Sequence, residues 1–296
     1  MLSDLSLRFQ EIEIVKIGFN MLLWSSNIGE EHFPLLQTMK DVGYDGVEFF
    51  LGEPEIEHHN KVGAELQRLG LGCTTVTCPP PEANPVSPDA TARAAGLDHM
   101  KWAIDATAAL GGDTLGGPFH SAYKVFTGKG PTDDERKWCA DVMREAAIYA
   151  QGANITLATE VINRFECYML NTGAQAQQLC DMVDQPNFGY LYDTHHSNIE
   201  EKSIADAIAT GKKHIKLVHI SECDRGAPGT GVVDWDTNFK TLKEIEYDGW
   251  MTIEAFSPDD PDFAAAIHVW REYDSKEEIY AGGYKFIKDM LAKHNF

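Results

Sequence analysis

Four side chains that could bind a metal ion or move a proton stand at the carboxyl ends of four short apolar runs. The runs are I-T-L-A-T-E, F-G-Y-L-Y-D, I-K-L-V-H and W-M-T-I-E, and they end in Glu160, Asp193, His219 and Glu254. These ends are separated by 33, 26 and 35 residues, close to the length of one strand-and-helix unit. If the runs are successive parallel strands of a barrel, their ends meet at one mouth.

The types of these four side chains favour a hard divalent cation. Three carboxylates and one imidazole, without a thiolate, suit Mn²⁺, Mg²⁺ or Co²⁺ better than a structural zinc, and one carboxylate could still act as a base. Taken singly, a strand-end acid is more often a helix N-cap or an ion-pair partner, and a lone histidine is more often a core residue. Four of them in consecutive strands, all at the same end, are much harder to explain in that way.

Further polar groups near these strand ends could bind a sugar-like ligand. His196 stands three residues after Asp193, and Arg225 lies in the glycine-rich stretch S-E-C-D-R-G-A-P-G-T-G. Alone, Arg225 would be read as a solvated surface residue. His120, after G-G-P-F, and His195 are weaker candidates. Trp24, at the end of the first predicted strand, could supply an apolar wall for a sugar ring, although a tryptophan is a core residue by default.

Strand-like and helix-like segments alternate eight times along the 296 residues, about 37 residues for each pair. The first strand is predicted over residues 15–23 and the last helical region over about 262–293. A short internal echo, K-D-V-G-Y-D-G-V-E and K-E-I-E-Y-D-G-W-M-T-I-E, supports equivalent units. This alternation predicts an α/β fold, a (β/α)8 TIM barrel, in one domain over residues 1–296 with an extension at 1–14. A doubly wound open sheet is the alternative, but its G-x-G-x-x-G turn is missing.

Composition restricts the partners and the compartment. The formal net charge of -21 gives no basic surface for a phosphate backbone, so nucleic acid is not an expected partner. The six cysteines form no C-x-x-C pair, which is typical of reduced thiols in a cytosol. Neither a signal peptide nor an apolar run of roughly 18 residues is present, so we expect a cytoplasmic protein without a membrane partner.

Three longer motifs contain the candidate residues. They are E-V-I-N-R-F-E-C-Y-M-L-N-T, Y-D-T-H-H-S-N-I-E-E-K-S-I and H-I-S-E-C-D-R-G-A-P-G-T-G-V-V-D-W. Together they resemble the ketose 3-epimerases of D-tagatose, D-psicose (allulose) and L-ribulose, which are xylose-isomerase-like TIM barrels. The resemblance covers the chain from Val15 to the C-terminal helix. It does not indicate which ketose is preferred.

The resemblance implies a function for each candidate. A divalent metal, most suitably Mn²⁺ with Mg²⁺ or Co²⁺ possible, would be held by Glu160, Asp193, His219 and Glu254. Glu160 and Glu254 would also form the acid/base pair that epimerises a free ketose at C3 through a cis-enediolate. Sugar contacts would come from Glu166, His196 and Arg225. A homodimer or homotetramer is also implied.

Some positions depart from the pattern of the resemblance, and other functions compete with it. Asn20, Ile28 and His195 stand where aromatic side chains are expected around the far end of the sugar. An aldose-ketose isomerase, a hydroxypyruvate isomerase or an inosose dehydratase would use the same barrel and carboxylates. A metal-dependent apurinic-site endonuclease would need more histidines and a basic face. A non-catalytic sugar- or metal-binding protein would not need both Glu160 and Glu254.

Overall fold

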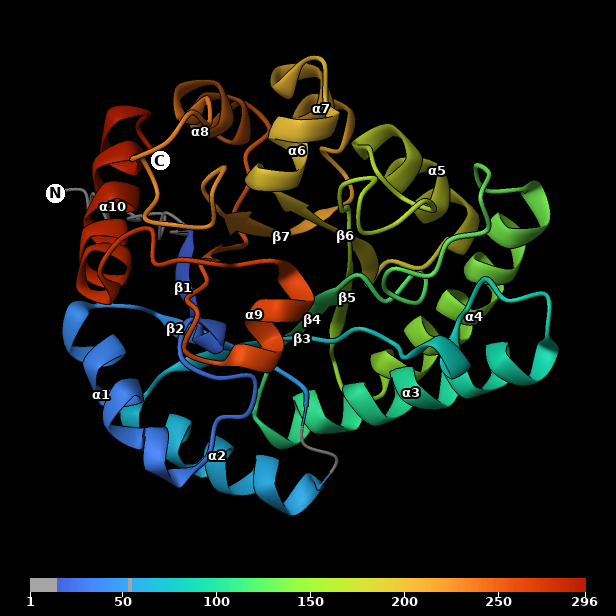
Figure 1. Ribbon diagram of the computed structural model, residues 1–296, viewed down its shortest axis with the longest axis horizontal. Helices are drawn as coiled ribbons and strands as arrows, with labels where there is room; N and C mark the ends of the chain where they lie inside the picture. The colour runs from blue at the N-terminus through green and yellow to red at the C-terminus, as the bar shows by residue number, and fades with distance from the viewer. Residues whose placement is uncertain (1–14, 53–54) are drawn as a thin grey trace, which may run out of the picture.

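Eight parallel strands close into a barrel in the computed structural model, which describes residues 15–52 and 55–296 (Figure 1). Each strand pairs with the next along the chain, and β1 pairs with β8 to close the ring, with Lys16 opposite Trp250. The strands are β1 Lys16–Asn20, β2 Gly46–Phe50, β3 Gly72–Val76, β4 Thr114–Gly117, β5 Thr156–Glu160, β6 Phe188–Asp193, β7 Ile215–Ile220 and β8 Trp250–Ile253. The predicted TIM barrel is therefore confirmed.

Helices surround the strands on the outside of the ring, except α9, which lies in front of the strands (Figure 1). They are α1 Phe33–Val42, α2 Ile56–Leu69, α3 Ala90–Ala109, α4 Asp133–Gln151, α5 Gly173–Val183, α6 Thr194–Glu200, α7 Ile204–Thr210, α8 Trp235–Glu244, α9 Pro261–Ile267 and α10 Gly283–Lys293. The predicted extension at residues 1–14 lies outside the described residues, and the division into one domain stays a prediction.

Two predicted boundaries were wrong, and each has a local cause. The first strand ends at Asn20 rather than at residue 23, because the Asn20 side chain accepts a hydrogen bond from the N–H of Leu22 and begins a 3-10 turn. The last helical region is two helices, since His268 has a left-handed φ of 64° and ends α9. Side-chain periodicity does not reveal such caps when the flanking segments are both helical.

Strand alternation decides which residues point into the barrel. Ala158, Leu191, Leu217 and Trp250 form an apolar cluster in the interior, which we call the floor cluster. Residues two positions further along a strand share its face, so Glu160, Asp193 and His219 also point inward, one layer nearer the carboxyl ends. The residues of opposite parity, such as Leu157, Tyr192 and Val218, point outward and belong to the main core beneath the helices.

The floor cluster closes the amino-terminal end of the barrel. Trp250 fills the space that two glycines of neighbouring strands leave, since a Cβ on Gly46 or Gly72 would lie 2.6 or 2.8 Å from its ring. Its indole N–H donates to Asp113 Oδ1 at 3.0 Å. The interior is therefore a packed core at this end, and a ligand can approach only from the carboxyl-terminal mouth.

The segment after β8 covers part of that mouth. Helix α9 crosses in front of the strands in Figure 1, and its Phe263 and Ile267 line the same cavity as Glu160. Lys124, from the loop after β4, donates to the carbonyl of Ala266 at 2.6 Å and so connects the end of α9 to the opposite rim. Among the described residues, no helix combines the length and the apolar character needed to cross a membrane.

Candidate active site

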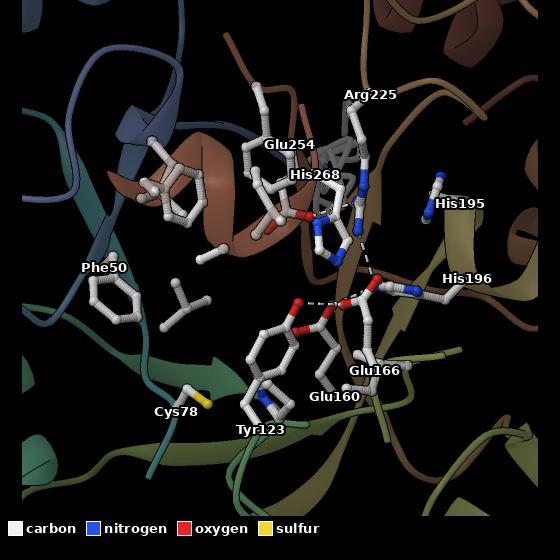
Figure 2. Close-up of a pocket in the computed structure, with 18 of the residues that line it drawn as sticks. Phe50, Cys78, Tyr123, Glu160, Glu166, His195, His196, Arg225, Glu254 and His268 are labelled. Carbon is white, nitrogen blue, oxygen red and sulfur yellow. Dashed lines mark hydrogen bonds and ion pairs between the residues drawn. The ribbon is translucent and has the colours of Figure 1, made fainter. Parts of the chain in front are cut away.

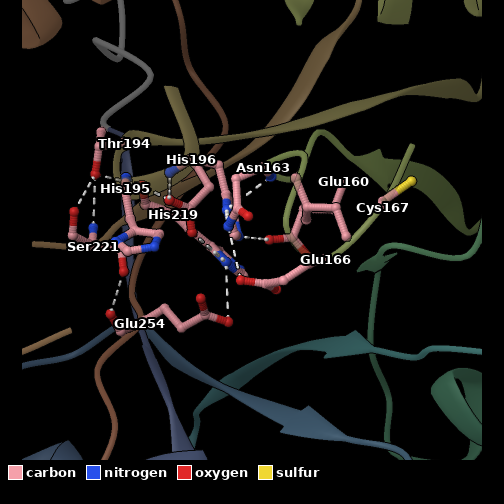
Figure 3. Close-up of polar contacts among 12 residues, drawn as sticks. Glu160, Asn163, Glu166, Cys167, Thr194, His195, His196, His219, Ser221 and Glu254 are labelled. Carbon is pink, nitrogen blue, oxygen red and sulfur yellow. Dashed lines mark hydrogen bonds and ion pairs between the residues drawn. The ribbon is translucent and has the colours of Figure 1, made fainter. Parts of the chain in front are cut away.

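The four strand-end residues predicted to form one site lie together at the carboxyl-terminal mouth. Figure 3 labels three of them, Glu160, His219 and Glu254. One ligand atom from each of Glu160, Asp193, His219 and Glu254 lies within 4.8 Å of all the others. All four residues are buried. Glu160 and Asp193 are the last residues of β5 and β6. His219 is the last but one of β7, and Glu254 directly follows β8. The barrel thus brings together side chains that are far apart in sequence.

Asp193 is both a helix cap and part of this group. Its Oδ1 accepts hydrogen bonds from the N–H groups of His195 and His196 and caps α6. Its Oδ2 faces the other way, 3.1 Å from Arg225 Nη1 and 3.7 Å from His219 Nδ1. The cap that would explain a single strand-end acid is therefore present, but it uses only one of the two carboxylate oxygens.

His219 presents one ring nitrogen to the group and the other to a carboxylate behind it. Both ring nitrogens are buried and make no hydrogen bond of regular geometry, and Nδ1 lies 3.3 Å from Glu254 Oε1. Nε2 lies 2.8 Å from Glu48 Oε1. Burial lowers the pKa of His219, but the negative charges of Glu48 and Glu254 outweigh this and hold the pKa well above its usual value. The ring thus lies in surroundings that attract positive charge.

Glu48 supports this geometry from the middle of β2 and was not recognised in the sequence. It is fully buried, and its oxygens accept hydrogen bonds from Asn20 Nδ2 and Thr74 Oγ1, both at 2.8 Å. Such a carboxylate behind a ligating histidine fixes the orientation of the ring. The sequence did contain a sign that Glu48 serves the site. The internal repeat around Tyr-Asp-Gly ends in Glu48 in its first copy and in Glu254 in its second.

Arg225 contacts the group from the loop after β7. Its Nη1 donates to Ser221 Oγ at 2.6 Å, Glu254 Oε2 at 2.8 Å and Asp193 Oδ2 at 3.1 Å. The guanidinium also lies over the ring of Phe256, 5.0 Å from its centroid. Arg225 has a left-handed φ of 67°, which is uncommon for a residue other than glycine and which the surrounding contacts must maintain.

His196 and Glu166 complete the polar side of the site. His196 Nδ1 accepts from the N–H of Asn163 at 3.2 Å, and Nε2 lies 2.9 Å from Arg225 Nη2 and 3.5 Å from Glu160 Oε1. Glu166 accepts from Asn163 Nδ2 at 2.8 Å and from the Tyr123 hydroxyl at 3.1 Å. Tyr123 is a further residue that sequence reasoning missed, and no motif distinguished it.

The carboxylates of the site differ in their proton affinity. Burial raises the pKa of Glu160, and the charge of Glu254 raises it further against the effect of His196, so the net shift is upward. Burial also acts to raise the pKa of Asp193, but the charges of Arg225 and His196 outweigh it and hold that pKa well below its usual value. Neighbouring carboxyl groups with opposite shifts can divide the work of holding charge and holding a proton.

A cavity of about 550 Å³ opens above these groups. Figure 2 shows Glu160, Glu166, His196 and Arg225 gathered on one side, with Phe50 and Cys78 on the other. Much of the rest of the wall is apolar, from Leu22, Val76, Phe256, Phe263 and Ile267. A ligand with a polar end and a less polar end would match this division.

Several predicted pocket residues lie elsewhere. Trp24 does not line the cavity but packs against Phe19 and Tyr280, at 5.4 and 6.1 Å between ring centroids. Phe50, Phe256 and Phe263 are among the aromatic side chains that line the wall instead. Ile28 belongs to the main core.

The three remaining positions differ among themselves. Asn20 is bonded to Glu48 rather than exposed to the cavity. His120 is fully buried beside Ser121 and Cys167, and burial lowers its pKa to about 4. His195 does line the cavity, with Nδ1 3.2 Å from the carbonyl oxygen of Glu222.

The site fits a divalent cation on the chemistry of its side chains. The buried Nδ1 of His219 is without a hydrogen bond and faces the carboxylates of Asp193 and Glu254. With Glu160 these groups supply only oxygen and nitrogen donors, the set that hard or borderline divalent ions prefer. The buried group could therefore hold a metal ion.

Comparison with known proteins agrees with the fold. The family model described as "Xylose isomerase-like TIM barrel" matches residues 36–289. A ketose 3-epimerase of Arthrobacter globiformis is 33% identical over 94% of this chain and 97% of its own length. A structure of L-ribulose 3-epimerase superposes with a TM-score of 0.90 at 27% identity, covering 95% of this chain and 96% of that one.

A third similar protein was solved with a sugar. It is D-allulose 3-epimerase from Methylomonas sp. in complex with D-allulose, with a TM-score of 0.87 and 29% identity over 94% of this chain and 97% of that one. The family model and the barrel place the chain among the xylose isomerase-like TIM barrels. Within that class it belongs to the ketose 3-epimerase family and is an epimerase of the isomerase class.

Proposed function

We propose that this protein epimerises free ketoses at C3 with Glu160 and Glu254 as the acid/base pair. The observation that carries the proposal is that both carboxylates face one cavity, from strands three places apart in the ring. The hydrogen-bonding groups of Glu166, His196 and Arg225 line the same cavity. Inversion at a carbon needs proton removal on one face and proton return on the other, which two separate carboxylates can perform.

The C3 proton of a ketose can be removed because the neighbouring C2 carbonyl accepts the resulting charge. One glutamate takes this proton on a carboxylate oxygen and leaves a cis-enediolate substrate. The other glutamate donates a proton to the opposite face of C3. Burial raises the pKa of Glu160, and a proton-transfer group works best when its pKa lies near the working pH.

A divalent cation would be held by Glu160, Asp193, His219 and Glu254, most suitably Mn²⁺, with Mg²⁺ or Co²⁺ as alternatives. When bound, it would supply Lewis-acid stabilisation of negative charge on substrate oxygens. Glu48 supports this assignment because it contacts the ring nitrogen of His219 that faces away from the group.

The sugar would be held at the reacting end by Glu166, His196 and Arg225. Asn163 and Tyr123 hold Glu166 in place, at 2.8 and 3.1 Å from its oxygens. Arg225 and His196 supply groups that can bind substrate oxygens. Fixed hydrogen-bonding partners of this kind orient a substrate for reaction. The apolar wall around Phe50 and Phe256 would face the remaining carbons of the chain.

The test is a panel of ketohexoses and ketopentoses incubated with the protein and Mn²⁺ in D₂O and followed by NMR. We expect deuterium at C3 of a product inverted at that carbon, and the panel ranks the substrates. Deuterium at C1 together with an aldose product would instead establish an aldose-ketose isomerase, and the proposal would fail.

Two further predictions concern the state of the protein in the cell. We propose a homodimer or homotetramer, in keeping with the family resemblance, and a cytoplasmic location, in keeping with cysteines that form no paired motif. Sedimentation equilibrium over a range of protein concentrations measures the first. A monomer at micromolar concentration would contradict it.

A further inference from the structure

The loop that carries Arg225 is wrapped around a buried carboxylate. Glu222 directly precedes this loop and is fully buried. Its Oε1 accepts hydrogen bonds from the N–H groups of Cys223 at 2.9 Å and Val233 at 3.2 Å. Its Oε2 accepts from the Gly229 N–H and the Trp235 indole N–H, both at 3.0 Å. One side chain therefore joins the beginning, the middle and the end of the loop.

Glycines in the loop leave the space that this carboxylate occupies. A Cβ on Gly231 would lie 2.5 Å from Glu222 Oε1 and 2.7 Å from Cδ, closer than such atoms approach. Gly229 has a left-handed φ of 90°, and its N–H points to Oε2. Two glycines of the G-A-P-G-T-G stretch, which the metal site and the acid/base pair do not explain, therefore allow the loop to enclose Glu222.

The same loop fixes Arg225 in its strained backbone conformation. The Arg225 N–H donates to the carbonyl of Glu222 at 3.1 Å, and the Arg225 carbonyl accepts from the N–H of Phe256 at 3.0 Å. Both contacts depend on where the loop lies relative to β7 and β8. The guanidinium then reaches Asp193 and Glu254.

We propose that Glu222 is a positioning residue for the reaction, which acts by holding the 223–233 loop so that Arg225 reaches the site. The inference rests on the proposed function for its kinetic part. Each oxygen of Glu222 accepts from two donors, so a glutamine would direct its NH₂ group at two N–H groups whichever way the amide turns. Glu222→Gln should therefore loosen the loop even though the side chains have the same shape.

The matched control is Asp113 at the opposite end of the barrel. It also accepts from a tryptophan indole N–H, that of Trp250, at 3.0 Å, but it touches no residue of the site. Asp113→Asn should lower the stability without changing kcat/KM. A comparison of the two variants separates an effect on Arg225 from a general loss of stability.

The experiment is a double-mutant cycle between Glu222 and Arg225. We expect Glu222→Gln to lower kcat/KM about 10- to 100-fold in the native background, as misplaced catalytic contacts do. In the Arg225→Ala background the same change should cost no more than about twofold, because the contact that it positions is already lost. An equal loss in both backgrounds would show that Glu222 does not act through Arg225.

Hydrogen exchange tests the loop without reference to activity. Amide exchange of residues 223–233 should be faster in Glu222→Gln than in the native protein and unchanged in Asp113→Asn. Unchanged exchange in the Glu222 variant would overturn the inference. If Glu222→Gln does not fold, Gly231→Ala replaces it, since the added methyl must displace the same carboxylate. A native protein without epimerase activity would reject the proposed function, and the exchange measurement would still decide the role of Glu222.

Discussion

The interior of the barrel contains two adjacent layers with opposite chemistry, although the same strands supply both. The floor cluster of Ala158, Leu191, Leu217 and Trp250 is apolar and closes the amino-terminal end. Two residues further along, β5, β6 and β7 supply Glu160, Asp193 and His219, all buried. We call these three residues and Glu254 the site layer.

Burying several like charges costs free energy, which the neighbouring apolar layer helps to offset. The comparison shows that the layer that stabilises the barrel and the layer that forms the site are separated by only two residues along each of these strands. Changes in the two layers should therefore have separable effects, and five substitutions test this.

The largest effect is expected from the site layer. Glu160→Gln and Glu254→Gln each remove one proton-transfer group, and we expect kcat to fall by about 10²- to 10⁴-fold or more. The barrel should stay folded, because a buried carboxylate is replaced by a neutral side chain of the same size. The D₂O exchange assay and circular dichroism measure the two properties. Substantial turnover in either variant would reject the two-carboxylate mechanism.

The next largest effect is expected from the floor. Trp250→Ala leaves a cavity between Gly46 and Gly72 and removes the hydrogen bond to Asp113, so unfolding should become easier by about 3–5 kcal/mol. Urea denaturation measures this loss. The protein that remains folded should bind Mn²⁺ with its native affinity. A parallel loss of Mn²⁺ affinity would show that the two layers are not separable.

Glu48→Gln tests the support behind the site layer. The glutamine can turn its oxygen to the Asn20 amide and the His219 ring and its NH₂ group to the Thr74 hydroxyl, but it removes the negative charge that faces His219. We expect Mn²⁺ affinity to fall about 10- to 100-fold, as measured by electron paramagnetic resonance of free Mn²⁺ during a titration. Asp113→Asn is the control and should leave the affinity unchanged. Native affinity in the Glu48 variant would limit Glu48 to a packing role.

The smallest effect is expected at the outer edge of the floor. Lys16 and Asp113 form an ion pair whose side chains are each 50% exposed. Lys16→Ala should change the free energy of unfolding by less than about 1 kcal/mol, because exposed pairs are screened by water and salt. Thermal unfolding at low and high salt measures it. A loss as large as that of Trp250→Ala would mean that Lys16 also supports the Trp250 ring, over which its Nζ lies at 4.7 Å.

The sequence by itself determined the barrel and the gathering of the four strand-end groups. The apolar runs ending in Glu160, Asp193, His219 and Glu254 predict parallel strands, and the spacing of one unit between them predicts a shared mouth. Both conclusions follow from local periodicity and from the geometry that every closed parallel barrel shares. The family motifs then added the sugar-binding candidates Glu166, His196 and Arg225, two of which were already distinguished by their position.

Only the tertiary structure decided which other residues serve the site. Glu48 lies in the middle of a strand and reaches His219 because strand alternation and barrel closure bring β2 opposite β7. Trp24 turns away into the core because Asn20 ends β1 early and starts a turn. Glu222 looks like any loop acid until the chain folds back around it. These contacts join residues distant in sequence or depend on caps and turns, so the pattern of residue types along the chain does not record them.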